Sequence, residues 1–372
     1  MKKLTRAAAL LLALCMALCF AACGEKTPDP TEAPAPTEAP ADTGILPEIA
    51  GESGTTYANL FTVILDGQYD ELWLSKAAAI VGEENVRPLE PLAPHTTFKI
   101  GGPADAFVSP RSVEEVSQVV CACEQAGIPW RVIGCGSDLL VSDEGVEGVV
   151  IEVRDNLSAI RVDGSCIVAG AGATNAAVAE AACAAGLSGY EFACGIPGTV
   201  GGAAIMNAGA YDGEFSQVCA RVTCVTPEGR IVEVSREEAD WSYRHSMFDA
   251  ARYVVVATTL ELAPADPADI RARMDELTAK REAKQPIDTP SAGSTFKRPE
   301  GHFAAALIDQ AGLKGLAIGG AQVSTKHTGF VVNAGDATSA DVQALIAEVQ
   351  RRVLESSGVA LEPEVRMWGR EA

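Results

Sequence analysis

The sequence predicts an α+β protein in which a larger domain occupies residues 71–264 and a smaller α/β domain occupies residues 265–372. Three observations support this prediction. Short β-type runs alternate with helical patterns that end at glycine. The stretch Pro264–Pro267 interrupts this alternation, and the segment Gly189–Gly213 is unusually dense in glycine and alanine. A chain of 372 residues is long enough for two such cores.

Residues 1–22 have the pattern of an export signal. A basic start precedes an apolar run from Ala7 to Phe20, and Ala21-Ala22-Cys23 resembles the cleavage box of a bacterial lipoprotein, with Phe20 where leucine is usual. The apolar run is too short for an ordinary membrane span. The membrane is therefore expected as a partner only through this leader, if it is processed.

Residues 23–70 carry no chemistry that the sequence reveals. From Gly24 to Gly44, near-repeats of Pro, Thr, Glu and Ala are too polar to build a core, which predicts an extended tether. The segment from Ile45 to Asp70 contains apolar residues but no recognisable motif.

The larger domain is expected to begin with a helix over residues 72–81 that ends at Gly82, because apolar residues recur there at helical spacing. Further helices are predicted at 113–126 and 174–185, each followed by glycine. Strands are predicted where short apolar and β-branched runs lie between turn residues, at 106–108, 130–133, 149–153, 159–162, 166–169, 222–226, 231–234 and 253–262. In the smaller domain, helices are expected at 270–284, 303–311 and 339–356.

The composition excludes some classes of function. A formal charge of −21 argues against nucleic-acid binding, which requires a basic face. An anionic substrate would have to be held by a few local cations. The four histidines have no regular spacing, so no metal site is expected.

The cysteines point to a reducing compartment. Of the eleven, three lie in the leader and the other eight are scattered without a C-x-x-C pair. Most stand in apolar patterns, which favours buried thiols over a zinc site or a disulfide framework. This expectation conflicts with the export-like leader.

The glycine-rich segment Gly189–Gly213 predicts close approach of the backbone to a phosphate-bearing ligand, because glycine permits positive φ and free N–H groups in turns bind anions. Two segments resemble the dinucleotide-binding motif G-x-G-x-x-G of Rossmann folds but do not match it. Gly170-Ala171-Gly172 has Asn175 at the next required glycine, and Gly134-Cys135-Gly136 has Leu139 there. A P-loop sequence does not occur.

Six motifs occur in order between residues 71 and 369: HTTFKIGGPAD from His95, GCGSDLLV from Gly134, GYEFACGIPGTVGGAAIMNAGAYDGE from Gly189, YRHSMF from Tyr243, AGSTFKRP from Ala292 and LEPEVR from Leu361. Together they resemble the UDP-N-acetylenolpyruvoylglucosamine reductase family of peptidoglycan precursor synthesis, in its shorter subtype without an extra substrate-covering insert. The resemblance implies a vanillyl-alcohol-oxidase-type (PCMH-like) FAD-binding domain followed by a smaller α/β substrate-binding domain.

The resemblance also implies a non-covalently bound FAD, with NADPH as hydride donor. The residues expected to line the FAD are Gly134, Gly136, Ser137, Asp138, Leu139, Gly195, Ile196, Pro197, Gly198 and Thr199. Two residues depart from the family, which usually has glycine and asparagine in place of Cys135 and Asp138. A carboxylate beside a diphosphate is repulsive unless it turns away or caps backbone, so Asp138→Asn is expected to tighten FAD binding.

For catalysis, the resemblance assigns Ser294 as proton donor and Arg244 as the residue that polarises the substrate carboxylate. Glu364 is the expected catalytic glutamate beside Ser294, and Lys284 is expected to bind an anionic part of the substrate. The neighbouring Glu362 is expected to be solvated and to have no role.

The implied function is NADPH-dependent reduction of UDP-N-acetylglucosamine enolpyruvate to UDP-N-acetylmuramate by a cytoplasmic monomer. Two alternatives stay open at this point. One is an FAD-dependent oxidase of the same fold. The other is an exported lipoprotein whose reductase-like body only binds a ligand, which the leader favours, although a fused or vestigial leader would also explain it.

Overall fold

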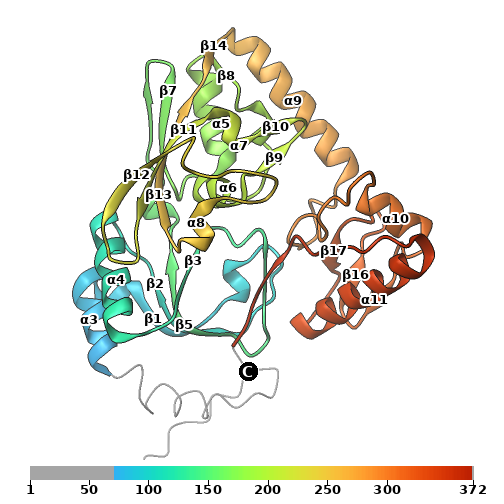
Figure 1. Ribbon diagram of the computed structural model, residues 1–372, viewed down its shortest axis with the longest axis horizontal. Coiled ribbons are helices and arrows are strands. Elements are labelled where there is room, and N and C mark those ends of the chain that lie inside the picture. The colour runs from blue at the N-terminus through green and yellow to red at the C-terminus, as the bar shows by residue number, and fades with distance from the viewer. Residues whose placement is uncertain (1–70, 371–372) are drawn as a thin grey trace, which may run out of the picture. The chain divides into compact units, whose positions relative to one another are not determined.

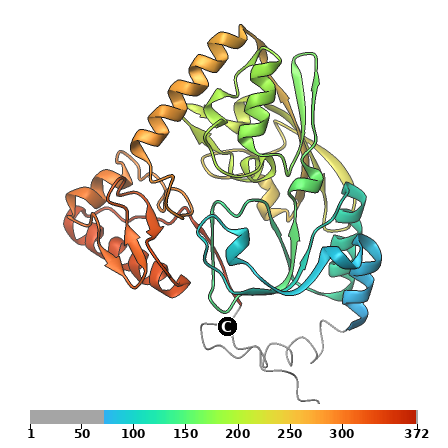
Figure 2. The same ribbon diagram turned by 180° about the vertical axis from the view of Figure 1, so that it is seen from behind.

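The computed structural model describes residues 71–370 (Figures 1 and 2). The predicted leader at 1–22 and tether at 23–70 lie outside the described residues, so their expectations stay predictions. Within the described residues, no helix is both long and apolar enough to cross a membrane.

The first sheet has the strand order β1-β2-β5-β3. Its strands are β1 (Val86–Pro91), β2 (Pro103–Val108), β5 (Val146–Glu152) and β3 (Trp130–Ile133). β1 runs antiparallel to β2, whereas β2, β5 and β3 are parallel. Every residue of β2 is buried, since both faces of this sheet are covered, as is usual where strands are parallel.

Two helices cover one face of this sheet: α3 (Glu71–Val81) and α4 (Val113–Ala126). The sequence predicts both ends of α4 correctly, because both signals are local. Ser112 accepts a hydrogen bond from the Glu115 N–H at the N-terminus, and Gly127 ends the helix at φ 66°. The other face packs Leu92, Phe107 and Val150 into a separate small core.

The second sheet is antiparallel and has the order β12-β11-β13-β7-β6. Its strands are β6 (Ile160–Asp163), β7 (Cys166–Gly170), β11 (Cys219–Val225), β12 (Ile231–Ser235) and β13 (Val254–Glu261). All five correspond to predicted strands. The helix α5 (Asn175–Ala184), capped by Thr174, contributes Val178 and Ala179 to the core that also contains β7 and β13 residues.

The glycine-rich segment contains a helix that the sequence does not predict, α6 (Val200–Met206). Thr199 caps it by accepting a hydrogen bond from the Gly202 N–H at 3.3 Å, and Asn207 ends it at φ 40°. Two adjacent glycines give this helix low intrinsic stability. Tertiary packing explains its presence, because Val200 and Ala204 are fully buried.

The long helix α9 (Pro267–Lys284) starts at Pro267, three residues before the predicted start. Asp266 caps it by accepting from the Ala268 N–H at 2.8 Å, a common arrangement before an N-terminal proline. In both ribbon views, α9 runs from the β14 (Ala263–Pro264) end of the larger part toward the C-terminal part (Figures 1 and 2).

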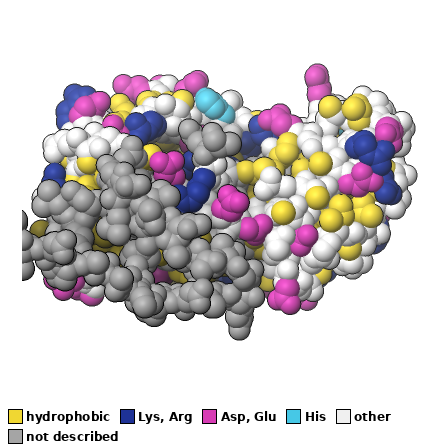
Figure 3. Space-filling model, turned by 90° about the horizontal axis from the view of Figure 1, so that it is seen from below, with side chains coloured by type: hydrophobic (Ala, Val, Ile, Leu, Met, Phe, Trp, Pro, Cys, Tyr) yellow, Lys and Arg dark blue, Asp and Glu magenta, His cyan; other side chains and the backbone are white. Residues whose placement is uncertain are grey.

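The C-terminal part packs α10 (Ala304–Gln310) and α11 (Ser339–Ser357) with a small sheet around a second core, to which Phe98, Ile100 and Leu140 of the larger part also contribute. That sheet consists of β15 (Ala317–Ile318), β16 (Ala321–Val323) and β17 (Val331–Asn333), which the sequence does not predict. On the face shown in Figure 3, acidic and basic side chains are interspersed among the described atoms.

The chain then returns to the larger part. Its last strand, β18 (Arg366–Trp368), pairs in parallel with β4 (Leu139–Val141), and this returning segment is red in Figures 1 and 2. The side chain of Trp368 packs against the small core around Phe107. This return brings the LEPEVR motif beside the GCGSDLLV motif.

Candidate active site

A cavity of about 710 Å³ is lined by residues from both parts of the described chain. All of the predicted cofactor, substrate and catalytic residues line it except Gly195. Those that line it are Gly134, Gly136, Ser137, Asp138, Leu139, Ile196, Pro197, Gly198, Thr199, Arg244, Lys284, Ser294 and Glu364. The structure therefore brings together residues from five separate motifs.

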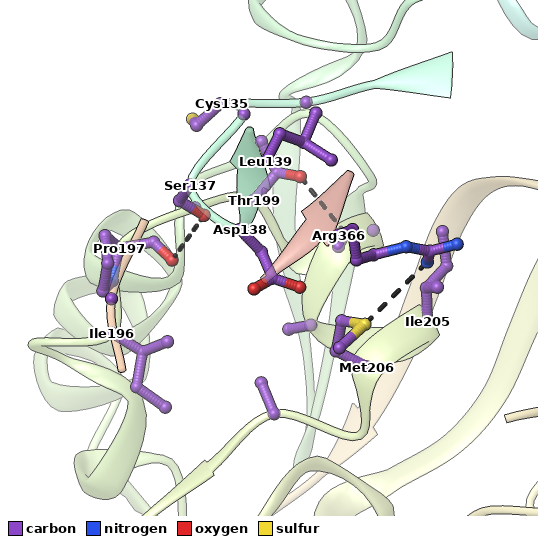
Figure 4. A pocket seen from close by; sticks show the side chains of 18 of the residues that line it. Cys135, Ser137, Asp138, Leu139, Ile196, Pro197, Thr199, Ile205, Met206 and Arg366 are labelled. Atoms are coloured by element: carbon purple, nitrogen blue, oxygen red, sulfur yellow. Dashed lines mark hydrogen bonds between the residues drawn. The ribbon is translucent and has the colours of Figure 1, made fainter. Parts of the chain in front are cut away.

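Two turns form one wall of the cavity: the first turn, Gly134–Leu139, and the second turn, Gly195–Thr199. The Ser137 Oγ donates a hydrogen bond to the Pro197 carbonyl at 3.2 Å (Figure 4). A Cβ on Gly134 would lie 2.5 Å from Thr199 Oγ1, and a Cβ on Gly198, where φ is +114°, would lie 2.6 Å from Ser137 Oγ. Glycine is thus required at both positions for the two turns to approach each other.

Gly195 lies apart from the other predicted cofactor residues. A Cβ at this position would lie 2.9 Å from Cδ of Arg281, so the residue packs against α9 and does not line the cavity. Ile196 to Thr199 of the second turn line the cavity, and the cofactor-binding role of Gly195 stays a prediction.

Arg244 and Glu364 form an ion pair in the cavity. The Arg244 Nε donates to Glu364 Oε1 at 2.6 Å, and the side chains are only 19% and 14% exposed. Arg244 has φ 55°, a left-handed backbone conformation that is uncommon for a residue other than glycine and is often found at functional sites. Burial lowers the pKa of Arg244, but the Glu364 carboxylate raises it, and the net shift is upward.

The loop that carries Ser294 lies beside the loop that carries Glu364, because the two loops pair through their backbones. The Glu364 N–H donates to the Thr295 carbonyl at 2.8 Å, and the Lys297 N–H donates to the Glu362 carbonyl at 2.9 Å. Thr295 is buried and its Oγ1 accepts from the Val331 N–H at 2.9 Å, which holds the loop in place. Ser294 itself is exposed on the cavity lining.

Asp138 lines the cavity with one carboxyl oxygen buried. Its Oδ2 is buried and has no hydrogen-bond partner among the described residues, so the side chain does not cap local backbone. Burial and then the nearby Glu364 raise the pKa of Asp138 to about 7, against the opposing charges of Arg366 and Arg244. In Figure 4 its carboxyl points away from Cys135 and into the cavity.

Lys284 is the last residue of α9 and is exposed at the cavity. It lies near His327, whose pKa is lowered by burial and further by the positive charge of Lys284. His327 and Arg366 line the cavity but were given no role from the sequence. The sequence contained a signal for Arg366, because this residue ends the LEPEVR motif. It contained none for His327, which belongs to no motif.

Residues 71–370 offer few other groups that could bind a metal ion or act as a nucleophile. In that range no three His, Cys, Asp or Glu side chains are grouped so that they could hold a metal ion. The eight cysteines there are free, and burial raises the pKa of three of them, Cys123, Cys219 and Cys224, to about 12. These three thiols are therefore unreactive at neutral pH.

The cavity fits a flavin cofactor. Its volume lies in the usual range for ligand sites, and one wall consists of the two glycine turns, which carry the short hydroxyl side chains of Ser137 and Thr199. Lys280, Arg281 and Lys284 line it and supply the local cations that anionic ligands need in an acidic chain.

Comparisons with known proteins agree with this geometry. Residues 104–235 match the family model of an FAD binding domain, and residues 285–368 match the UDP-N-acetylenolpyruvoylglucosamine reductase C-terminal domain. The predicted α+β fold, with an FAD-binding domain followed by a smaller C-terminal domain, is confirmed. The predicted boundary between residues 264 and 265 stays a prediction.

Full-length relatives extend the match. A UDP-N-acetylenolpyruvoylglucosamine reductase of Lachnoclostridium phytofermentans is 47% identical over 300 residues, which cover 80% of this chain and 97% of that protein. One of Agathobacter rectalis is 50% identical over 292 residues, which cover 75% and 93%. The crystal structure of the reductase from Thermus caldophilus superposes with a TM-score of 0.66 at 35% identity, covering 76% of this chain and 99% of that one. The chain therefore belongs to the UDP-N-acetylenolpyruvoylglucosamine reductase family of FAD-dependent oxidoreductases.

Proposed function

We propose that this protein reduces UDP-N-acetylglucosamine enolpyruvate to UDP-N-acetylmuramate with NADPH as electron donor, in peptidoglycan precursor synthesis. The observation that carries the proposal is the meeting of Arg244, Ser294 and Glu364 in the cavity walled by the two glycine turns. This grouping of the three side chains argues against a function limited to ligand binding. Binding alone does not need a proton donor together with a paired guanidinium and carboxylate.

When bound, FAD supplies a two-electron relay between NADPH and the enolpyruvyl group. The first and second turns would hold it through backbone N–H groups and through the hydroxyls of Ser137 and Thr199. The cations at the end of α9, Arg281 and Lys284, offset the negative charge of the diphosphates brought in by cofactor and substrate.

Arg244 binds the carboxylate of the enolpyruvyl group. Its Nε donates to Glu364, and because none of the described residues accepts from the terminal Nη groups, these can make charge-assisted hydrogen bonds to substrate. As negative charge develops on the carbon next to that carboxylate, the guanidinium stabilises it. Glu364 fixes the orientation of the guanidinium, because the ion pair is mostly shielded from water.

Ser294 delivers the proton to the carbon that carries this developing charge. Its exposure in the structure means that bound substrate must exclude water from the hydroxyl. Glu364 lies in the loop paired with the Ser294 loop and keeps Arg244 oriented during this step, and the serine oxygen left behind regains its proton from water when the site reopens. General-acid steps of this kind are worth about 10²–10⁴ in rate.

We propose that the protein acts as a monomer in the cytoplasm, where NADPH, FAD and nucleotide sugars are present. The free cysteines of the described part agree with a reducing compartment. Mass analysis of the N-terminus of the native protein tests this proposal. A lipid on Cys23 would place the protein at a membrane instead.

The full-length protein, purified and loaded with FAD, provides the test of function. Anaerobic NADPH should bleach the flavin absorbance, and the enolpyruvyl sugar nucleotide should then restore it with formation of the lactyl ether. A protein that takes up no flavin, or whose reduced flavin is reoxidised by oxygen but not by this substrate, would reject the proposed function. The second result would favour an oxidase.

A further inference from the structure

The buried Oδ2 of Asp138 is unexplained by the fold. The residue lines the cavity, and none of the described residues gives this oxygen a hydrogen bond. Buried polar atoms almost always have a partner. Its backbone is well anchored, since the Asp138 carbonyl accepts from the Arg366 N–H at 2.9 Å, so the side chain is held in the cavity by pairing between β4 and β18.

The charged groups around Asp138 do not neutralise it. Glu364, in the loop before β18, is a like charge, and Arg244, in the loop before α8 (Met247–Ala250), already donates to Glu364 at 2.6 Å. Arg366 on β18 donates to Asp249 Oδ1 at 2.6 Å. His95 lies against Gly136 of the first turn, and its Nε2 is 2.8 Å from Oε1 of Glu90.

Two carboxyl groups therefore face the cavity, and none of the cations among the described residues forms an ion pair with Asp138. The two anions of the proposed function, the FAD diphosphate and the enolpyruvyl carboxylate, would be repelled by a charged Asp138. Burial and Glu364 raise the pKa of Asp138 to about 7, so the neutral and the charged form are both populated near neutral pH. A neutral carboxyl group has one O–H donor, whereas a carboxylate has none.

We propose that Asp138 is protonated when ligand binds and donates its carboxyl O–H to an anionic oxygen in the cavity, so that this anion is held less tightly as the pH rises. The inference rests on the proposed function, which supplies the two candidate anions. Their shared chemistry is an anionic oxygen that needs a donor at this point of the wall.

The experiment measures two dissociation constants between about pH 6 and about pH 8.5, a range that brackets the expected titration. The first is the Kd of FAD for the apoprotein, followed by quenching of flavin fluorescence. The second is the Kd of the enolpyruvyl sugar nucleotide for the oxidised, FAD-loaded protein, followed by the shift in flavin absorbance. Neither measurement requires turnover, so a failure of the reductase reaction would reject the proposed function without deciding this proposal.

The wild-type protein is expected to lose affinity for one of these ligands by up to about tenfold per pH unit above pH 7, as for a single linked proton. In Asp138→Asn the amide donates at every pH, so the Kd of that ligand should be constant and equal to the low-pH value of the wild type. If the Kd of FAD depends on pH, the diphosphate is the acceptor of this hydrogen bond. If the Kd of the sugar nucleotide depends on pH, the enolpyruvyl carboxylate is the acceptor.

The matched control is Asp163→Asn, which removes an exposed carboxylate on β6 that is paired with Arg161 and does not line the cavity. It should keep the pH dependence of the wild type. Equal pH dependence in the wild type and in Asp138→Asn for both ligands would overturn the proposal. If Asp138→Asn does not fold, wild-type Kd values that stay constant for both ligands across this range would overturn it without a variant.

Discussion

Arg244 and Glu364 are 120 residues apart in the chain, yet the Nε of Arg244 donates a hydrogen bond to Oε1 of Glu364 at 2.6 Å. Each partner is held independently: Arg244 by a left-handed turn and Glu364 by its backbone bond to Thr295. The pair therefore links the larger part of the chain to the C-terminal segment within the cavity. The following predictions test this arrangement and its surroundings.

Glu364→Gln should slow the reoxidation of the reduced flavin by the enolpyruvyl substrate. Loss of the charge releases Arg244 from its ion pair and removes the carboxylate from the loop paired with the Ser294 loop, so we expect substrate-dependent reoxidation of the flavin to fall by about 10²–10⁴. Reduction by NADPH should be unchanged. Stopped-flow flavin absorbance measures both steps, and Glu362→Gln is the control, because Glu362 is exposed and paired with Lys297. Equal losses in the two variants would contradict a special role for Glu364.

Ser294→Ala should let NADPH reduce the flavin at the wild-type rate and should block its reoxidation by substrate, because only the second step needs the proton. Single-turnover kinetics separate the two steps. Ser291→Ala, in the same loop but not in the lining of the cavity, should behave as wild type. If Ser294→Ala slowed both half-reactions equally, the assignment of Ser294 as proton donor would be wrong.

Gly198→Ala should weaken FAD binding by at least about tenfold and lower the Tm. The added Cβ would lie 2.6 Å from Ser137 Oγ at a φ of +114°, and such backbone strain alone costs about 1–3 kcal/mol. Gly312→Ala is the control, since φ there is also positive, at +69°, but nothing lies within 4 Å of its Cβ. Flavin titration and thermal unfolding give both effects, and equal losses of FAD affinity would show that the two turns do not need to meet.

Asp138 should lower the stability of the folded protein as the pH rises. Its folded-state pKa is about 7, against 3.8 in the unfolded chain, so between about pH 4 and about pH 7 the folded state binds more protons and the free energy of unfolding falls with rising pH. Asp138→Asn should remove this contribution, of the order of 1–4 kcal/mol because water screens a partly exposed group. Urea unfolding of both proteins near pH 4.5 and near pH 8 measures it. If the two proteins differed in free energy of unfolding by the same amount at both pH values, the prediction would be refuted.

Lys284→Gln should raise the KM for the sugar nucleotide while leaving the rate of flavin reduction by NADPH unchanged. A hydrogen bond to a charged group contributes about 1.5–3 kcal/mol, or about 10- to 100-fold in affinity. Lys314→Gln removes an exposed lysine that does not line the cavity and should have no effect. An unchanged KM in Lys284→Gln would exclude contact between this lysine and the substrate.

Most of the regular elements could be predicted because their signals are local. The ends of α4 and the start of α5 follow from Ser112, Gly127 and Thr174, and the strands of the antiparallel sheet lie within a few residues of the predicted runs. The helix α6 could not be predicted, because Gly201 and Gly202 disfavour helix and only burial of the segment compensates. The three-residue strands β4 and β18 also lack a local signal, since each exists only through pairing with the other.

The order of motifs along the chain was enough to identify the family and to name 13 of the residues that line the cavity. The amino-acid sequence alone therefore determined the class of fold, the cofactor and most of the candidate site. Only the tertiary structure decided that Gly195 faces α9, that Arg244 is bonded to Glu364, and that Asp138 has a buried oxygen without a partner. The physical reason is that burial and electrostatic surroundings depend on which distant segments fold against a residue, and spacing along a chain does not contain that information.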